Sequence, residues 1–293
     1  MQSLLRERRI ELGGYQTRAL ELDGDGAPIV FLHGFADSAD TWRRAMGLLG
    51  RRGQRAVALD LPGFGTATPL DLDEPVMPQL DRFAVAAIEH VAGQHGPVVL
   101  SGNSLGGCVA LRLAERDGLP LAAVAPVAPA GLDMPVWLMA IERDPIVRGL
   151  LAIPFPLPEI LVRTAVGEAY RNLAFARPRA VPGEVVSAFT SHVRNRVTAA
   201  RYLTTAQRML PELRDPFRLA QISCPVLLVW GERDRMVTHR GAQRVTDALP
   251  HTTYELIRGC GHCPQVEEPD RFVDILLRFV GALDAGDQWR RPA

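Results

Sequence analysis

Residues 98–107 read VVLSGNSLGG, an apolar run that leads directly into the pattern Gly-x-Ser-x-Gly formed by Gly102, Ser104 and Gly106. The run predicts a buried strand, and the residues after it have the pattern of a helix. A chain that turns sharply from strand to helix holds its middle residue in a strained conformation, and small residues two positions away on each side let neighbouring backbone approach. The spacing therefore predicts a nucleophile elbow, with the Ser104 hydroxyl exposed at a sheet edge and at a helix N-terminus that stabilises negative charge.

Further short apolar runs predict a sheet whose strands are buried on both faces. Together with the first run, they cover residues 28–32, 55–59, 97–100, 121–127, 225–230 and 253–257. Helical patterns lie between them, at residues 41–49, 79–91, 105–116, 241–249 and 270–280. A hairpin of residues 8–12 and 15–22, turning at Gly13-Gly14, comes first. This alternation predicts an α/β fold, with helices on both faces of a mostly parallel, doubly wound sheet.

The alternation stops between about residues 131 and 215, where the sequence is punctuated by prolines and mostly helical in pattern. Ligands bind at the carboxyl ends of the strands in open α/β sheets, so an insertion here is placed to cover such a site. We therefore expect a core formed by residues 1–130 and 216–293, and a helical cap, or lid, formed by residues 131–215.

A serine hydroxyl needs a neighbouring base to act as a nucleophile. Among the seven histidines, His262 has the best setting, because it comes directly after the last expected strand, in the sequence GCGHCP. An acid must orient the imidazole. Asp234 and Glu232 both follow the preceding strand, and a turn at Gly231 favours Asp234. The predicted catalytic residues are therefore Ser104, Asp234 and His262.

An oxyanion hole requires backbone N–H donors next to the nucleophile. The N–H of Leu105 directly follows Ser104 in the chain. A second donor is expected from the loop HGFA at residues 33–36, where we favour the N–H of Phe35. We expect His33 to brace this loop rather than to transfer protons.

These segments together resemble the serine members of the α/β-hydrolase superfamily that carry a helical cap. The resemblance covers about residues 8–280. It rests on five motifs: HGF at 33–35, DLPGFG at 60–65, GNSLGG at 102–107, GERD at 231–234 and GH at 261–262. It implies the α/β-hydrolase fold and the catalytic triad in the chain order Ser, Asp, His. It is much less specific for the substrate, because function depends on the site rather than the fold.

With serine as the nucleophile, the expected chemistry is transfer of an acyl group to water through an acyl-enzyme on Ser104. The apolar and aromatic content of the expected cap favours a carboxylic ester with small to medium, fairly hydrophobic groups. Lactonase, thioesterase and cofactor-free perhydrolase chemistry need the same three residues, and a non-enzymatic binding module can retain them, so these alternatives stay open. The residues expected to bind the substrate are Trp137, Tyr170, Arg194, Arg196 and Arg201.

A second reading is hydrolysis of a carbon–carbon bond. GNS at 102–104 and GERDR at 231–235 resemble the corresponding segments of meta-cleavage-product hydrolases. That family carries Trp directly after the catalytic histidine and holds the substrate carboxylate with a cap arginine. Here Cys263 takes the place of the tryptophan, whereas Arg194, Arg196 or Arg201 is placed to bind a carboxylate. The missing tryptophan puts ester hydrolysis first and C–C hydrolysis second.

All basic residues are arginines, and the 33 of them balance 33 acidic residues. The absence of lysine excludes lysine Schiff bases and lysine-activated serines. Zero net charge argues against nucleic acid as a partner. No apolar run approaches the roughly 20 residues that span a membrane, and the charged N-terminus does not have the pattern of a signal peptide, so we expect a cytoplasmic protein. We expect neither a metal nor an organic cofactor, and we leave open whether the protein is an oligomer.

Cys260 and Cys263 flank the predicted catalytic histidine in the sequence CGHC, which is also found in disulfide isomerases. Redox motifs of that kind belong near the start of a thioredoxin fold, and the cysteines are too closely spaced around His262 for a zinc site. We expect both cysteines to be small packing residues. The alternative left open is a disulfide between them that strains the His262 loop and reduces activity.

Overall fold

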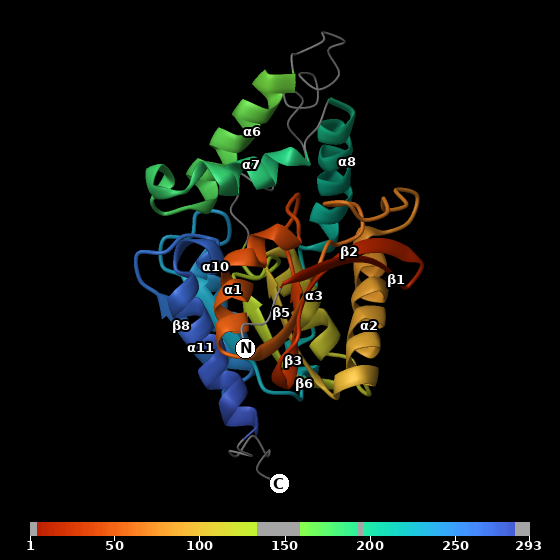
Figure 1. Ribbon diagram of the computed structural model, residues 1–293, viewed down its shortest axis with the longest axis vertical. Helices are drawn as coiled ribbons and strands as arrows, with labels where there is room; N and C mark the ends of the chain where they lie inside the picture. The colour runs from red at the N-terminus through yellow and green to blue at the C-terminus, as the bar shows by residue number, and fades with distance from the viewer. Residues whose placement is uncertain (1–4, 134–158, 193–195, 285–293) are drawn as a thin grey trace.

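The computed structural model describes residues 5–133, 159–192 and 196–284. The described residues form an eight-stranded sheet in the order β1-β2-β4-β3-β5-β6-β7-β8, with helices on both sides (Figure 1). The strands are β1 (Arg6–Leu12), β2 (Tyr15–Leu22), β3 (Asp25–Leu32), β4 (Gln54–Leu59), β5 (Val98–Asn103), β6 (Leu121–Val127), β7 (Leu227–Gly231) and β8 (Thr253–Ile257).

Strand directions follow the expected pattern. β1 and β2 form an antiparallel hairpin that turns at Gly13 and Gly14, both of which have positive φ. β2 pairs antiparallel with β4, and all neighbours from β4 to β8 are parallel. The prediction of a mostly parallel α/β sheet with a preceding hairpin is confirmed.

β5 extends three residues beyond the predicted end at Leu100. Ser101, Gly102 and Asn103 continue the parallel ladder with β6, and the Ser101 hydroxyl donates a hydrogen bond to the carbonyl of Ala125 at 2.8 Å. The polar and small residues after the apolar run are therefore part of the strand. As a result, the strand itself carries the chain to the point where Ser104 begins the turn.

Helices cover both faces of the sheet. α1 (Arg43–Arg51) and α11 (Pro269–Asp284) pack together on one face, and α2 (Val76–His95), α3 (Leu105–Ala114) and α9 (Ala242–Ala248) cover the other. Short helices lie in the connections: η1 (Ala39–Trp42), η2 (Pro178–Ala180), η3 (Leu219–Gln221), η4 (His239–Gly241) and α10 (Pro264–Glu267). Within the described ranges, no helix combines the length and the apolar character needed to cross a membrane.

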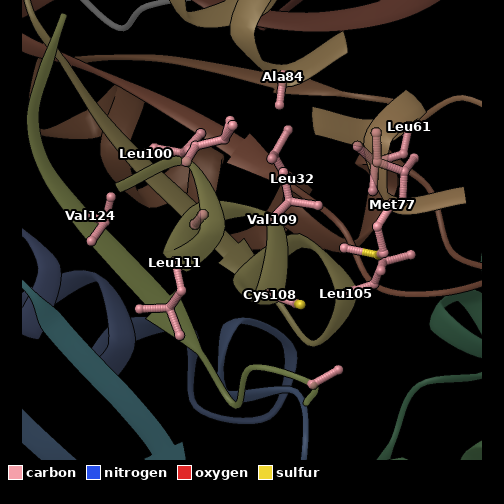
Figure 2. Packing of buried hydrophobic residues seen from close by; sticks show 14 of the residues in the cluster. Leu32, Leu61, Met77, Ala84, Leu100, Leu105, Cys108, Val109, Leu111 and Val124 are labelled. Atoms are coloured by element: carbon pink, nitrogen blue, oxygen red, sulfur yellow. The ribbon is translucent and has the colours of Figure 1, made fainter. Parts of the chain in front are cut away.

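The core is divided by the sheet into two apolar layers because successive strand residues point to opposite faces. On β3, Val30 and Leu32 contribute to the layer under α2 and α3, whereas Ile29 and Phe31 contribute to the layer under α1 and α11. Figure 2 shows Leu32 in the first layer, close to other buried side chains from strands and helices. Because both faces of these strands are buried, most of each strand appears in the sequence as a continuous apolar run.

α2 begins at Val76, three residues before the predicted start. The carboxylate of Glu212 accepts hydrogen bonds from the N–H groups of Val76 (2.8 Å) and Met77 (3.0 Å). These are two of the N–H groups that a helix leaves unpaired at its start, and a carboxylate also suits the positive end of the helix dipole. The helix is therefore capped by a residue 136 positions away, which a local sequence pattern does not reveal.

Among the residues that the structure describes between β6 and β7, the α-helices are α6 (Glu159–Ala174), α7 (Gly183–Ser191) and α8 (Arg196–Glu212), and we call these the insertion helices. They lie together at one end of the molecule, above the sheet in Figure 1. The chain leaves the sheet after β6 and returns at β7, and these two strands are direct neighbours. The division into a core and a separate cap stays a prediction.

Candidate active site

Ser104 lies between β5 and α3 with φ 53° and ψ −110°, a conformation that L-residues rarely adopt. Its N–H donates to the carbonyl of Val127 on β6 (2.9 Å), and its carbonyl accepts from the N–H groups of Cys108 (2.9 Å) and Ala130 (3.0 Å). These backbone bonds hold the strained residue from three directions. The predicted sharp turn between strand and helix is therefore present at this serine.

The two glycines of the pattern are required by close backbone contacts. A Cβ at Gly102 would lie 2.3 Å from the backbone of Gly106, and a Cβ at Gly106 would lie 2.3 Å from the carbonyl oxygen of Leu32. Neither contact is compatible with a side chain, and both involve backbone that cannot rotate away. The spacing of the pattern thus has the steric cause that the sequence suggested.

His262 is buried and paired with Asp234, and the Nδ1–Oδ2 distance is 2.7 Å. Its other ring nitrogen, Nε2, is also buried and has no hydrogen-bond partner among the described residues. An aspartate at Nδ1 holds the proton on that nitrogen and leaves Nε2 as the basic atom. The arrangement gives His262 one nitrogen that is available to a group in the neighbouring cavity.

Asp234 is held by several donors besides the histidine. Its Oδ1 accepts from the N–H groups of Met236 (2.8 Å) and Val237 (3.0 Å), and its Oδ2 accepts from Nε1 of Trp230 (3.2 Å). By contrast, the competing carboxylate of Glu232 is exposed and accepts from the N–H of Gly259. The structure therefore brings Asp234, and not Glu232, to His262.

The loop that carries His262 contacts the end of the first insertion helix. The N–H of His262 donates to the carbonyl of Ala174 at 2.7 Å. The carboxylate of Glu267 accepts from both Gly261 (2.9 Å) and Ala176 (2.9 Å). Asn103 closes the other side, because its Nδ2 donates to the carbonyl of His262 at 3.0 Å. Sequence reasoning missed Glu267 and Asn103, since nothing local marks either side chain as a neighbour of the histidine.

Leu105 and the loop that contains Phe35 lie next to Ser104. Leu105 is the first residue of α3, so its N–H is one of those that the helix does not use. The loop after β3 is close by, because a Cβ at Gly34 would lie 3.5 Å from Cβ of Ser104. Phe35 and Leu105 both line the same cavity as Ser104. The geometry is therefore compatible with the predicted hole.

His33 is completely buried beneath this loop. Its Nδ1 donates to the carbonyl of Gly34 (2.7 Å), and its Nε2 accepts from the N–H of Leu61 (2.8 Å). Burial lowers the pKa of His33 to about 4, so the ring is neutral at physiological pH. Both nitrogens are occupied by backbone groups, which agrees with a bracing role.

Ser104 and His262 line a common cavity of about 490 Å³. The insertion helices provide much of its wall, and the residues they contribute are almost all apolar: Val166, Leu173, Ala199, Leu203, Met209 and Leu210. Tyr170 also lines the cavity, and its ring stacks on Phe189 with the ring centres 3.6 Å apart. Tyr202 is a further lining residue. The predicted catalytic residues Ser104 and His262 therefore form part of the wall of a mainly apolar cavity.

The other expected substrate-binding residues do not join this cavity. Arg201, on α8, is not among the described residues that line it, and its guanidinium donates to the carbonyl of Leu70 at 3.4 Å. Trp137 and Arg194 lie outside the described residues, and the structure describes the backbone but not the side chain of Arg196. The structure thus brings Tyr170 to the cavity but not Arg201.

Asp37 is a lining residue that the sequence did not single out. It lies in the loop after β3, its side chain is almost completely buried, and it is the only aspartate or glutamate among the described residues that line the cavity. No arginine appears among those residues. Asp37 comes shortly after His33 and Gly34 in the sequence HGFAD. A loop sequence of this kind does not indicate whether the aspartate side chain is buried.

Cys260 and Cys263 are both buried free thiols. Burial raises the pKa of each thiol above its ordinary value, which disfavours the reactive thiolate. Cys263 lines the cavity, and its sulfur lies 3.8 Å from Oδ1 of Asn103 and 3.9 Å from the hydroxyl of Tyr170. In the described part of the chain, no three His, Cys, Asp or Glu side chains gather in an arrangement that would hold a metal ion.

Comparison with known protein families matches residues 29–275 to the "Alpha/beta hydrolase family". One curated relative is the 2-hydroxy-6-oxo-6-(2'-aminophenyl)hexa-2,4-dienoic acid hydrolase of Metapseudomonas resinovorans. It is 24% identical over 284 residues, which cover 94% of this chain and 90% of the relative. Another is the pimeloyl-[acyl-carrier protein] methyl ester esterase of Nitrosomonas europaea. It is 29% identical over 263 residues, which cover 87% of this chain and 96% of the relative.

Among solved structures, a putative aryl esterase from Burkholderia cenocepacia superposes with a TM-score of 0.74 and 24% sequence identity. The match covers 96% of this chain and 100% of that chain. At this identity the likeness concerns the fold alone.

Proposed function

Because the chain belongs to the alpha/beta hydrolase family, we propose that it is a serine hydrolase that cleaves carboxylic esters of small to medium, fairly hydrophobic substrates. The observation that carries this proposal is the pairing of His262 with Asp234 at the edge of a cavity that Ser104 also lines. Relatives named as an ester esterase and as a lipase support the same class of reaction.

The proposed mechanism assigns one role to each of these side chains. Nε2 of His262 takes the proton of the Ser104 hydroxyl while the oxygen attacks the ester carbonyl. Asp234 holds the imidazole in the required tautomer and stabilises the imidazolium that forms. The negative charge of the tetrahedral intermediate lies on the former carbonyl oxygen, where the N–H groups of Phe35 and Leu105 donate to it.

The same groups complete the acylation step and then carry out the deacylation step. The imidazolium returns its proton to the departing alcohol, which leaves an acyl group on Ser104. A water molecule enters and loses a proton to Nε2 of His262 as it attacks the acyl carbonyl. The tetrahedral intermediate then collapses as the imidazolium returns this proton to the Ser104 oxygen, which releases the carboxylic acid and restores both the Ser104 hydroxyl and the neutral imidazole.

The cavity supports the choice of substrate class. Its volume of about 490 Å³ lies within the range of small-molecule sites, and its walls are mainly aliphatic and aromatic. Burial of an apolar acyl or alcohol group stabilises the complex by roughly 25 cal/mol per Å² of surface removed from water. We propose that the insertion helices act as a cap that shields the acyl-enzyme, since they supply much of the cavity wall.

A second candidate function is hydrolysis of a carbon–carbon bond. It is favoured by the dienoic acid hydrolase that matches 94% of this chain. Against it, Cys263 occupies the position after His262, and Arg201 contacts Leu70 rather than the cavity. A substrate carboxylate would therefore find no cationic partner among the described lining residues.

A panel of p-nitrophenyl esters of increasing acyl length, run beside a 2-hydroxy-6-oxo-dienoate, tests the proposal. We expect turnover of the esters, with kcat/KM rising with acyl length until the cavity is filled. A fluorophosphonate probe should label Ser104, and the folded variant Ser104→Ala should neither turn over the esters nor be labelled. Cleavage of the dienoate without ester turnover would instead establish the second function.

A further inference from the structure

Asp37 lies within the loop that supplies the proposed oxyanion donor, and only 6% of its surface is exposed. It lines the large cavity together with Ser104 and also a second pocket of about 40 Å³ that includes Asp40 and Arg44. A carboxyl group in such a place is costly to ionise, because burial removes the water that would solvate its charge. A buried carboxylate is normally offset by a cation or by several donors.

The surroundings of Asp37 provide only part of this compensation. Its Oδ1 accepts a hydrogen bond from the N–H of Ser38 at 2.8 Å, the Thr41 side chain also hydrogen-bonds to it, and neither an arginine nor a histidine is among the groups with the largest effect on its ionisation. Arg44 donates instead to the carbonyl of Val266 at 3.0 Å. Asp40, the nearest acidic neighbour in sequence, is neutralised by Arg18 and Arg43.

The titratable groups around Asp37 come from several elements, and the charged groups with the largest effect on its carboxyl are acidic. His192, at the end of α7, interacts electrostatically with His33 beneath the same loop. Tyr170 on α6 and the Cys263 thiol interact with Asp37 electrostatically, as do Asp40 and Asp60. Arg44 lines the smaller pocket, and His262 lines the large cavity. Burial, reinforced by Asp40 and Asp60 and opposed by Ser38 and Thr41, raises the pKa of Asp37 to about 7.

We propose that Asp37 is a specificity-determining residue that makes the cavity discriminate by charge, so that substrates with a neutral or cationic acyl chain are preferred over those with a carboxylate. An anionic acyl chain would place a second negative charge near a buried carboxylate in a mainly apolar cavity, where charges interact far more strongly than in water. This inference rests on the proposed ester hydrolase function and deepens it by naming the class of acyl group.

Three esters of similar size and shape provide the test: mono-p-nitrophenyl adipate, p-nitrophenyl 6-methylheptanoate and p-nitrophenyl 5-(trimethylammonio)pentanoate. They place a carboxylate, an isopropyl group or a quaternary ammonium at the far end of the chain. The measured quantity is the ratio of kcat/KM for the charged ester to that for the neutral ester, between pH 6 and 8.5. A ratio cancels any general effect of a substitution or of pH on catalysis.

In the wild-type protein, the adipate ratio should fall about tenfold as the pH rises through 7, and the trimethylammonio ratio should rise. In Asp37→Asn both ratios should stay constant with pH, and the adipate ratio at pH 8.5 should be about tenfold above the wild-type value. Asp247→Asn, which removes an exposed charge on α9, is the matched control and should retain the wild-type pH dependence.

A wild-type ratio that does not change with pH would overturn the proposal even if Asp37→Asn fails to fold, and so would equal ratios in wild type and Asp37→Asn. Absence of turnover of the neutral ester would overturn the proposed function instead. In that case titration calorimetry with free adipate and free 6-methylheptanoate applies the same comparison to binding. Equal pH dependence of the two affinities would then overturn the role of Asp37.

Discussion

The N–H of His262 donates a hydrogen bond to the carbonyl of Ala174, so the histidine loop is joined directly to the end of α6. Glu267 reinforces this junction, because its carboxylate accepts from Gly261 on one side and Ala176 on the other. The position of the proposed catalytic base therefore depends on contact with an insertion helix. Rearrangement of that helix would also move the imidazole.

Glu267→Ala should lower both stability and kcat. It removes the acceptor of two partly buried N–H groups, which costs about 1–3 kcal/mol and loosens the loop that orients His262. We expect a drop of several degrees in Tm and a kcat about tenfold lower, with most of both restored in Glu267→Gln. Thermal unfolding and ester kinetics measure the two effects. Glu268→Ala, one residue further on, removes a side chain that is 38% exposed and lies 4.0 Å from Arg177, and it should change neither; an equal loss in that variant would contradict the role of Glu267.

Ser104→Ala and Ser104→Gly should separate chemistry from strain. Both remove the nucleophile, so kcat should fall at least about a thousandfold. Only glycine relieves the φ of 53°, and the expected gain in the free energy of unfolding is about 1 kcal/mol. Differential scanning calorimetry should find a higher Tm for Ser104→Gly than for Ser104→Ala. A lower value would mean that the conformation is not strained.

Asp234→Asn and Glu232→Gln compare the two carboxylates that follow β7. An amide at position 234 favours the wrong tautomer of His262, and kcat should fall by about 10⁴. Among the described residues, the Glu232 side chain accepts a hydrogen bond from the N–H of Gly259 and not from His262, so its amide variant should retain kcat within about threefold. Kinetics with a saturating ester measure both. Comparable losses in the two variants would remove Asp234 from its proposed role.

Asp37→Asn should stabilise the protein in a manner that depends on pH. The pKa of Asp37 is raised to about 7 in the folded chain from about 4 in an unfolded one. The folded state therefore holds a proton that the unfolded state releases, and stability declines as pH rises from about 4 to about 7. The loss is on the order of 4 kcal/mol above that range. Urea unfolding should show the advantage of Asp37→Asn over wild type growing between pH 5 and pH 8; a constant difference would exclude titration of this group as its cause.

Activity should be the same in dithiothreitol and in diamide. Both thiols that flank His262 are buried, and burial raises the pKa of Cys263 and of Cys260, so little thiolate is present to react. Steady-state ester hydrolysis after each treatment is the measurement. Loss of activity in diamide, restored by dithiothreitol and absent from Cys260→Ala, would instead support a disulfide that strains the loop.

The sequence predicted the features that depend on local patterns. Gly102 and Gly106 are recognisable because the contacts that require them lie around one turn, and buried parallel strands are recognisable because both of their faces are apolar. The pairing of Asp234 with His262 was also accessible, since each residue follows a strand and parallel strands end at the same edge of a sheet.

Other features depend on the assembled structure. The start of α2 is determined by Glu212, and the setting of Asp37 is determined by α6, α7 and the His262 loop, all of which are distant in sequence. Arg201 lies in the segment that the sequence predicted as a cap. The orientation of its helix, α8, brings the guanidinium to the carbonyl of Leu70 and not to the cavity. Burial of a single polar side chain and the direction of a helix face are properties of packing, and one sequence does not record them.

The junction between β6 and β7 has a consequence for how such a protein can diversify. Val127 and Val229 pair directly, and Ala128 donates its N–H to Val229 at 2.9 Å, so the two strands meet without help from the segment that separates them in sequence. A lineage can lengthen, shorten or replace much of that segment and thereby change the cavity wall while Ser104, Asp234 and His262 stay on the sheet, provided that the contact between the His262 loop and Ala174 is kept. The same property makes the segment a natural unit for grafting between homologues.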